Sequence, residues 1–114
     1  MAKNYQDVYF HFVELSERFK QTKPAYLIDP IEIEILNTIL LSSRSGKLLL
    51  ASDLCGVRKI ASPATIHNRL TKLYKKKFVT HLIGDDARKK YLELSPSAME
   101  YIDGFGKCIV KACQ

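Results

Sequence analysis

Apolar side chains recur every three or four residues along the first 20 positions of the chain. The stripe that they form consists of Tyr5, Val8, Tyr9, Phe12, Leu15 and Phe19. Such spacing predicts an amphipathic helix over about residues 5–20. Phe10 and Val13 fall outside the stripe and leave apolar surface on a second side of the helix. Because one small core does not need both sides, we expect a helix of a partner chain to cover the second.

Three helix starts are marked by a capping residue followed by proline, at Asp29-Pro30, Ser62-Pro63 and Ser95-Pro96. The capping oxygen accepts a hydrogen bond from a free N–H group of the first turn, and proline already has the helical φ angle. The pattern predicts helices over about residues 30–42 and 63–76, and a last helix from residue 96 toward the C-terminus. Gly104 and Gly106 weaken the prediction that this last helix is unbroken.

Between these helices the pattern changes. Residues 20–28 are expected to be a linker, residues 47–50 a short buried strand and residues 51–57 a short helix. Alternating apolar residues predict strands over 78–83 and 89–94, joined by a turn into a hairpin. Two short helices followed by a β-hairpin are typical of a winged helix-turn-helix, whose second helix enters the major groove of DNA.

Positive charge is concentrated in the same part of the chain. Residues 54–84 contain seven Lys or Arg and no Asp or Glu. Residues 54–90 contain ten basic and two acidic residues, a net charge of +8, although the whole chain has a net charge of only +6. A field of one sign confined to one segment indicates a polyanionic partner. A lysine-rich surface without such a partner is the alternative.

The predicted helix over residues 63–76 has two opposite faces. On a wheel of about 100° per residue, Ile66, Leu70 and Leu73 face the core. The opposite face is short, polar and cationic, and it has no acidic residue, whereas an ordinary solvated face usually carries both signs. The DNA contacts predicted on this helix are Ser62, Ala64, Thr65, His67, Asn68, Thr71, Lys72 and Lys75.

These residue types suit different parts of a duplex. Asn68 can form a bidentate pair with adenine, and Thr71 can contact a thymine methyl group. Ser62 and Lys72 are better placed for phosphates, which N–H groups at a helix start also bind. The alternative for this helix is an ordinary solvated face.

The predicted hairpin tip carries further basic residues, Arg88, Lys89 and Lys90, with Asp86 just before them. In a wing, an arginine can enter the narrow minor groove, where the negative potential is enhanced. Asp86 can hold the arginine or the backbone of the turn in shape. The alternative is a charged turn with a local ion pair, which contributes little free energy.

Three segments together resemble the multiple-antibiotic-resistance-regulator (MarR) family: residues 70–79, Asp86-Ala87-Arg88 and residues 92–96. Those proteins have a recognition helix, a wing with Asp-x-Arg at its tip and a similar entry to the next helix. The resemblance covers residues 29–101 and implies a homodimer whose terminal helices interlock and whose recognition helices bind a pseudo-palindrome.

Two positions depart from the family pattern. Lys77 stands where the family usually has glycine, and Ser95 stands where threonine is commoner. The chain is also shorter than typical members, so we expect a reduced C-terminal dimerisation helix.

The expected fold is mainly α with a small β-hairpin wing, an α+β winged helix-turn-helix in a single domain. Residues 1–28 are the expected N-terminal dimerisation helix and linker, 29–94 the winged-helix core and 95–114 the C-terminal dimerisation helix. The predicted dimer contacts are Tyr5, Tyr9, Phe10, Phe12, Val13, Ile102, Phe105 and Ile109.

Other classes of protein find little support in the sequence. The three histidines lie far apart and none has a cysteine or carboxylate at metal-ligand spacing, so we expect no metal, no cofactor and no enzyme. Cys55 is expected to be a buried structural thiol, with redox sensing as the alternative. The chain has three cysteines, an odd number without paired spacing, which suits the cytoplasm. We expect neither a membrane span nor a signal peptide, because no apolar run is long enough.

The sequence therefore predicts a cytoplasmic, homodimeric repressor that binds double-stranded DNA and can respond to a small-molecule effector. One alternative is a winged-helix replication or partition module of a plasmid or phage. Another is a module that binds an acidic protein through the basic face. Large exposed apolar residues on that face would favour protein binding, and the sequence has none there.

Overall fold

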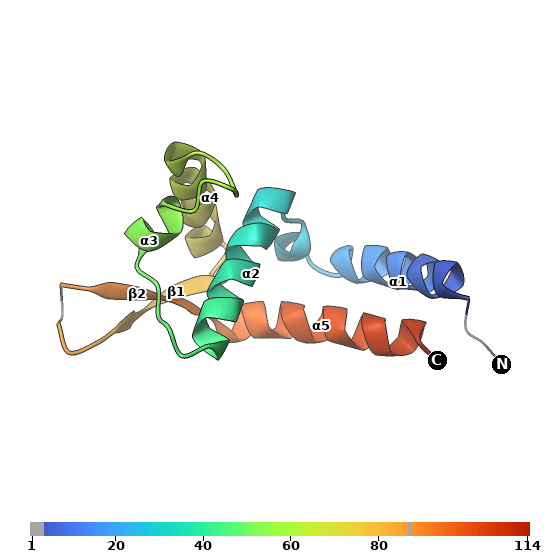
Figure 1. The fold of residues 1–114 in the computed structure, drawn as a ribbon. Coiled ribbons are helices and arrows are strands. Elements are labelled where there is room, and N and C mark those ends of the chain that lie inside the picture. The colour runs from blue at the N-terminus through green and yellow to red at the C-terminus, as the bar shows by residue number, and fades with distance from the viewer. Residues whose placement is uncertain (1–3, 87) are drawn as a thin grey trace. The chain divides into compact units, whose positions relative to one another are not determined.

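A computed structural model of the chain describes residues 4–86 and 88–114. Within them the elements are α1 (Tyr5–Lys20), η1 (Pro24–Tyr26), α2 (Pro30–Arg44), α3 (Ala51–Cys55), α4 (Pro63–Lys75), β1 (Val79–Ile83), β2 (Lys90–Leu94) and α5 (Pro96–Ala112) (Figure 1). The predicted mainly α fold with one hairpin is confirmed. The chain divides into two compact units, one of residues 28–98 and one of the remaining residues. No described helix is both long and apolar enough to cross a membrane.

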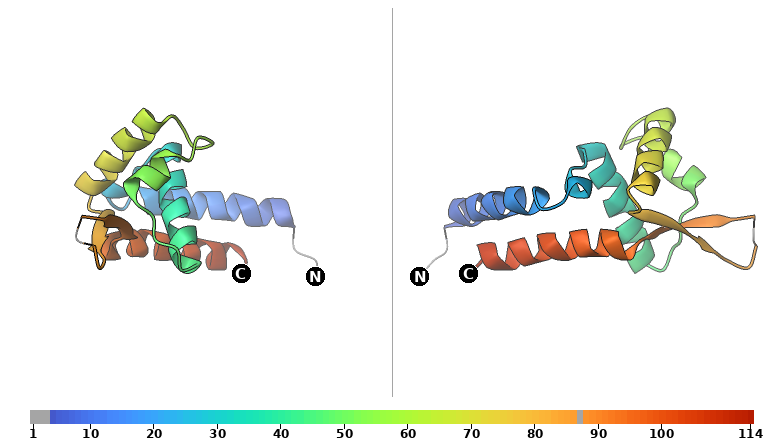
Figure 2. Two further views of the ribbon diagram at one scale, coloured as in Figure 1. Left: turned by 60° about the vertical axis from the view of Figure 1, so that its left-hand side comes forward. Right: turned by 180° about the vertical axis from the view of Figure 1, so that it is seen from behind.

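The unit of residues 28–98 is a winged helix. α2 and α3 both pack against α4 and against β2, and the hairpin extends beyond the helices (Figures 1 and 2). The core draws on every one of these elements, and its fully buried residues are Ile35, Ile39, Leu54, Ile66, Leu70, Leu73, Phe78, Val79 and Leu92. The predicted inward face of α4 is therefore confirmed.

The three predicted capping residues all start helices. In α2, Asp29 Oδ1 accepts the Glu32 N–H at 2.8 Å, and Glu32 Oε1 accepts the Asp29 N–H at 3.1 Å. Ser62 Oγ accepts a backbone N–H of α4 at 3.3 Å. Ser95 Oγ accepts one of α5 at 3.1 Å. Each cap satisfies an N–H group that the helix itself leaves free.

The expected strand over residues 47–50 was wrong. Leu48 is exposed, Leu50 forms an isolated bridge to Tyr91, and the Leu49 carbonyl accepts the Leu92 N–H at 2.7 Å. Successive side chains of an extended chain point to opposite sides, so consecutive leucines cannot all face one core. The hairpin itself is antiparallel, with Val79 opposite Leu94 and Ile83 opposite Lys90.

A left-handed residue, Lys77, follows the C-terminal end of α4, and its φ angle is 62°. The Phe78 N–H donates to the Leu73 carbonyl and the Lys77 N–H to the Tyr74 carbonyl, both at 3.0 Å. This pair of bonds is a Schellman motif, in which glycine is favoured because a Cβ is strained at positive φ. Lys77 is the position at which the resemblance leads one to expect glycine.

The second unit contains α1, η1 and residues 99–114 of α5. α1 and α5 lie side by side and antiparallel (Figures 1 and 2). An aromatic cluster joins them, with ring centroids 4.8 Å apart for Phe19 and Tyr26 and 5.3 Å apart for Phe19 and Phe105. Tyr26 is buried and belongs to η1, so the prediction that residues 20–28 are only a linker was wrong.

α5 is a continuous helix from Pro96 to Ala112 in spite of its two glycines. A Cβ on Gly104 would lie 1.9 Å from Cζ of Phe19, whereas a Cβ on Gly106 would have nothing within 4 Å. Gly104 therefore permits the close approach of an aromatic ring and does not interrupt the helix.

Candidate nucleic-acid interface

The polar face of α4 points away from the core. The side chains of Ser62, Ala64, His67, Asn68, Lys72 and Lys75 are exposed, and those of Thr65 and Thr71 are half-buried. None of the eight residues predicted on this helix is buried. We call these eight residues the α4 polar face.

Two hydroxyl groups of the α4 polar face are already engaged. The Ser62 hydroxyl donates to Thr65 Oγ1 at 3.0 Å, and the Thr71 hydroxyl donates to the His67 carbonyl at 3.0 Å. Because its hydrogen is held by the helix backbone, Thr71 has its methyl group and the two lone pairs of its oxygen left for another contact. This is the state in which threonine can touch a thymine methyl group.

Two further basic residues, Arg69 of α4 and Lys76 just after it, form ion pairs with residues at the start of α2. Arg69 Nε lies 2.5 Å from Asp29 Oδ2, and Lys76 Nζ lies 3.6 Å from Glu32 Oε2. The Glu32 side chain is buried, and its Oε2 makes no hydrogen bond to any described residue. These contacts span about 40 residues of chain, so no local sequence pattern reveals them.

Asp29 is a charged group in a partly sheltered position. Partial burial acts to raise the pKa of its carboxyl, but the hydrogen bonds from the Glu32 N–H and from Arg69 outweigh that effect. The pKa of Asp29 therefore lies below its usual value of 3.8. The carboxylate is ionised at neutral pH and available to hold Arg69.

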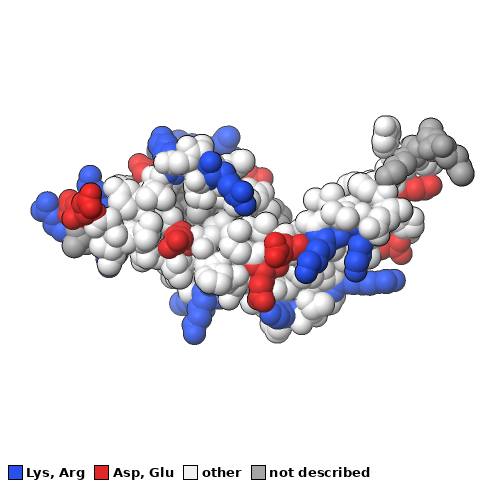
Figure 3. All heavy atoms as spheres, turned by 90° about the horizontal axis from the view of Figure 1, so that it is seen from below, with Lys and Arg blue, Asp and Glu red and all other residues white. Residues whose placement is uncertain are grey.

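Asp86 and Arg88 contact each other at the hairpin tip. Asp86 Oδ1 accepts the Arg88 N–H at 3.0 Å and lies 3.3 Å from Arg88 Nε. The Arg88 side chain is 92% exposed, and Lys89 and Lys90 are exposed as well. Figure 3 shows basic and acidic side chains side by side at this end of the hairpin. Ala87, the middle residue of the tripeptide, lies outside the described residues.

A tyrosine–histidine pair connects α4 to the hairpin. Tyr74 Oη and His81 Nε2 are 2.9 Å apart, and His81 is exposed. Burial, and secondarily the nearby Cys55 thiol, raise the pKa of Tyr74 above its usual value of 10.0. Cys55 is half-buried, so the prediction of a buried thiol was wrong for this residue; the buried cysteine is Cys108. The described residues contain no group of His, Cys, Asp or Glu that could hold a metal.

The predicted dimer contacts fall into two classes. Tyr5, Tyr9, Phe10 and Ile109 are exposed, by 84% in the case of Tyr5, whereas Phe12, Val13, Ile102 and Phe105 are half-buried. Phe105 already stacks on Tyr101 of its own chain at 4.8 Å between centroids.

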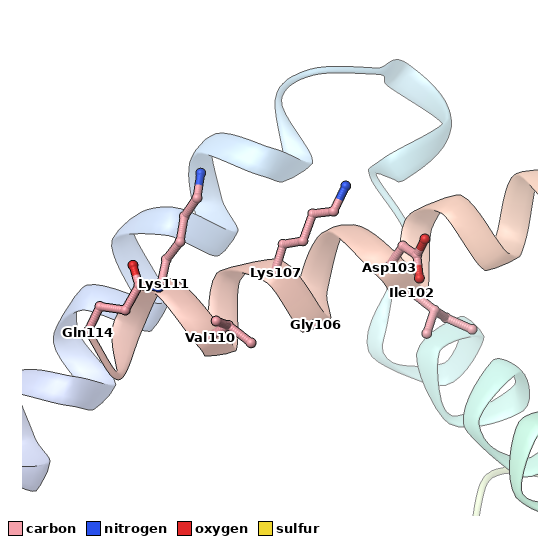
Figure 4. Close-up of a pocket in the computed structure, with 7 residues that line it drawn as sticks. All are labelled: Ile102, Asp103, Gly106, Lys107, Val110, Lys111 and Gln114. Atoms are coloured by element: carbon pink, nitrogen blue, oxygen red, sulfur yellow. The ribbon is translucent and has the colours of Figure 1, made fainter.

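The exposed apolar residues lie where α1 begins and α5 ends. A shallow groove of about 230 Å³ lies there, lined by Tyr5, Val8, Tyr9, Phe12, Ile109, Ala112 and Cys113. On α5, Ile102 and Val110 point away from the ends of Lys107 and Lys111 (Figure 4). The free ends of α1 and α5 therefore present apolar surface that the described residues do not cover.

Comparison with known proteins gives matches in structure but not in sequence. No family model and no curated protein matches the chain. MepR of Staphylococcus aureus bound to ethidium bromide superposes with a TM-score of 0.71 at 15% identity, over 94% of this chain and 73% of MepR. The transcriptional regulator Tm0710 of Thermotoga maritima gives 0.67 at 15% identity, over 94% and 70%.

A complex of MepR with DNA is also similar, with a TM-score of 0.65 at 17% identity over 94% of this chain and 73% of MepR. MepR and Tm0710 are transcription regulators of the MarR family. The chain has their fold. The family resemblance read from residues 29–101 is therefore confirmed at the level of fold, including the helices on either side of the winged helix.

Proposed function

We propose that this protein is a sequence-specific regulator of transcription that binds double-stranded DNA as a homodimer and acts as a repressor. The observation that carries the proposal is the α4 polar face. It is accessible, it contains no acidic residue, and it lies opposite the buried residues Ile66, Leu70 and Leu73. A helix with these properties at the second position of a winged helix-turn-helix is suited to the major groove.

On this proposal the residues of α4 divide between bases and phosphates. Asn68, Thr71 and Ala64 contact base edges, because their side chains are short and lie along the centre of the face. The phosphate contacts come from the helix start and its flanks, namely Ser62, Thr65, His67, Lys72 and Lys75. Phosphate contacts set the position of the helix on the duplex, and base contacts select the sequence.

The hairpin tip supplies a second, smaller contact. Arg88 reaches into the minor groove beside the half-site, and Lys89 and Lys90 bind the flanking phosphates. Asp86 supports this role by holding the Arg88 backbone and side chain at 3.0 and 3.3 Å. An arginine whose backbone and side chain are both held by Asp86 loses less conformational entropy when it enters a groove.

The exposed apolar residues of α1 and α5 support dimerisation through these two helices. Four large apolar side chains are more than half exposed in the single chain, those of Tyr5, Tyr9, Phe10 and Ile109. Exposed apolar surface of this kind is typical of a protein–protein contact. Contact between two such surfaces would bury them and relate two recognition helices by a two-fold axis. Two half-sites about one helical turn apart then give the affinity that one short helix cannot supply.

A bound dimer would occupy its operator and keep other proteins from it, which supports repression. We place the protein in the cytoplasm, where its DNA and its three cysteine thiols are both expected. An effector would fit the cavity of about 540 Å³ formed within the α1–α5 unit, which is in the size range of ligand sites. MepR, which has the same fold, has been solved with ethidium bromide bound.

A gel-shift titration of duplex DNA against the purified protein tests the proposal. The variant Lys75→Ala removes one cation from the α4 polar face, and Lys20→Ala on α1 removes the same charge elsewhere. We expect Lys75→Ala to weaken binding and to lower the slope of log affinity against log salt by about 1, and Lys20→Ala to leave both unchanged. Equal effects of the two variants would mean that binding depends on net charge and not on α4.

A further inference from the structure

A chain of two hydrogen bonds connects the start of α2 to the outward face of α4. Asp29 Oδ2 accepts from Arg69 Nε at 2.5 Å, and Arg69 Nη1 donates to Asn68 Oδ1 at 3.1 Å. Arg69 thus lies between a carboxylate near the core boundary and an exposed amide on the α4 polar face.

The two carboxylate oxygens of Asp29 bind different partners. Oδ1 accepts the Glu32 N–H and caps α2, and Oδ2 holds Arg69. The Arg69 and Asp29 side chains are only 27% and 35% exposed, so solvent screens their interaction less than it screens a surface pair. Because the capping bond fixes its position, the Asp29 carboxylate holds the guanidinium of Arg69 in place.

The contact with Arg69 also determines how the Asn68 amide is turned. A guanidinium has only donors, so the amide atom that faces it must be the acceptor Oδ1. The opposite end of the amide, Nδ2 with its two hydrogens, is then free for another partner. Asn68 presents donors more readily than an acceptor, because one lone pair of Oδ1 is already occupied.

This orientation bears on which base Asn68 can select. A bidentate pair with adenine, as expected from the sequence, requires Oδ1 to accept from the adenine N6 amino group. Guanine presents two acceptors in the major groove, N7 and O6, and requires only donors from the protein. The amide as held by Arg69 therefore matches guanine better than adenine.

We propose that Asn68 selects guanine by donating from Nδ2, and that Asp29 and Arg69 are positioning residues that set its amide. The inference rests on the proposed function, since it assigns the base preference of the same α4 polar face. Arg69 acts through Asn68 and makes no base contact of its own. The three residues operate as one unit, although Asp29 is 40 residues away from Arg69 in the chain.

The test is a selection of bound duplexes from a random pool by the full chain and four variants. Asn68→Ala identifies the base pair that Asn68 contacts, because preference is lost there. Asn68→Asp has the same shape but only acceptors, and it should move the preference at that base pair to cytosine, which presents a donor. Asp29→Asn keeps a capping oxygen for α2 but removes the charge that holds Arg69, and Arg69→Met removes the link itself.

We expect the wild-type chain to prefer guanine at that base pair by roughly tenfold over adenine. Asp29→Asn and Arg69→Met should both reduce that preference severalfold while leaving the other positions of the site and the binding to non-specific duplex unchanged. A merely structural role of Arg69 would instead weaken binding at all positions together.

Three results would overturn the inference alone: a wild-type preference for adenine, an unchanged preference in Asp29→Asn and Arg69→Met, or a general loss of affinity in both. If Arg69 bound DNA directly, Asp29→Asn would release it and tighten binding, which is also contrary to the inference. A wild-type chain that retained no duplex at all would overturn the proposed function, and the inference with it.

Discussion

Gly104 of α5 lies directly beneath the aromatic ring of Phe19 of α1. A Cβ on Gly104 would be 1.9 Å from Cζ and 2.2 Å from Cε1 of that ring, far inside van der Waals contact. The ring has little room to retreat, because it also packs against Tyr26 and Phe105 at 4.8 and 5.3 Å between centroids. The packing of α1 against α5 therefore depends on a missing side chain at one position.

We expect Gly104→Ala to destabilise the protein by up to about 2 kcal/mol. Overpacking of a filled site costs about 1–3 kcal/mol, and alanine regains about 1 kcal/mol over glycine inside a helix. Gly106→Ala is the matched control, since nothing lies within 4 Å of its Cβ position and only the helical gain remains. Urea unfolding should show a lower stability than wild type for Gly104→Ala and a higher stability for Gly106→Ala. Equal stability changes would mean that the Phe19 contact does not matter.

Lys77→Gly should stabilise the protein by about 0.5–1 kcal/mol. Lysine at a φ angle of 62° carries backbone strain that glycine avoids, and the greater freedom of glycine in the unfolded chain offsets part of the gain. Lys77→Ala keeps the Cβ and should show little change, which separates the backbone effect from the loss of charge. Thermal unfolding measures both variants, and a lower melting temperature for Lys77→Gly would contradict this account of the end of α4.

The Asp29–Arg69 ion pair should give the protein a stability term that disappears in acid. The pKa of Asp29 is lowered below 3.8 in the folded protein, so the term is fully present above the ordinary pKa and is lost as the pH falls through the folded-state value. We expect wild type to be more stable than Asp29→Asn at about pH 6 and the difference to be smaller at about pH 3. Urea unfolding at the two pH values gives the comparison. A difference of the same size in acid would show that the charge of Asp29 is not its source.

A charge at the free end of α1 should separate the proposed dimer. Tyr9 is 69% exposed in the single chain, so Tyr9→Asp leaves the subunit fold intact and places a carboxylate in the interface. We expect the dissociation constant of the dimer to rise about thirtyfold, the loss of roughly 2 kcal/mol typical of a buried tyrosine contact. Sedimentation velocity over a range of concentrations measures it. Gln21→Asp, which adds the same charge beyond the other end of α1, is the control and should dimerise as the wild type does.

Arg88→Ala should weaken DNA binding by about 1–3 kcal/mol without altering the stability of the protein. The Arg88–Asp86 ion pair is exposed and contributes little to folding, so any loss of affinity reports on the groove contact itself. Gel-shift affinity and thermal unfolding, measured on the same preparation, separate the two effects. Unchanged affinity would remove the hairpin from the proposed interface.

Much of the fold could be predicted because its signals are local. The bounds of α1 follow from the spacing of its apolar residues, and Asp29, Ser62 and Ser95 each mark a helix start in the structure. The α4 polar face could be predicted for the same reason, since the helical period alone decides which side chains point outward. Its role in binding DNA stays a prediction.

The relationships that could not be predicted join residues far apart in sequence. The sequence gives no sign that Tyr26 packs beside Phe19, that Gly104 makes room for that ring, or that Arg69 meets Asp29. Each of these contacts exists only once two elements have packed together. Local patterns predicted a linker around Tyr26 and a helix weakened at Gly104, and they gave no partner for Arg69.

The most direct test of the central claim is a hydroxyl-radical footprint of the wild-type chain on duplexes selected from a random pool. If two α4 polar faces read the major groove as a dimer, the footprint will show two inverted half-sites about one helical turn apart. The combined change of Asn68, Thr71 and Lys75 to alanine will abolish it. A footprint that survives those three changes, or a wild-type chain that protects no duplex at low salt, would contradict the account.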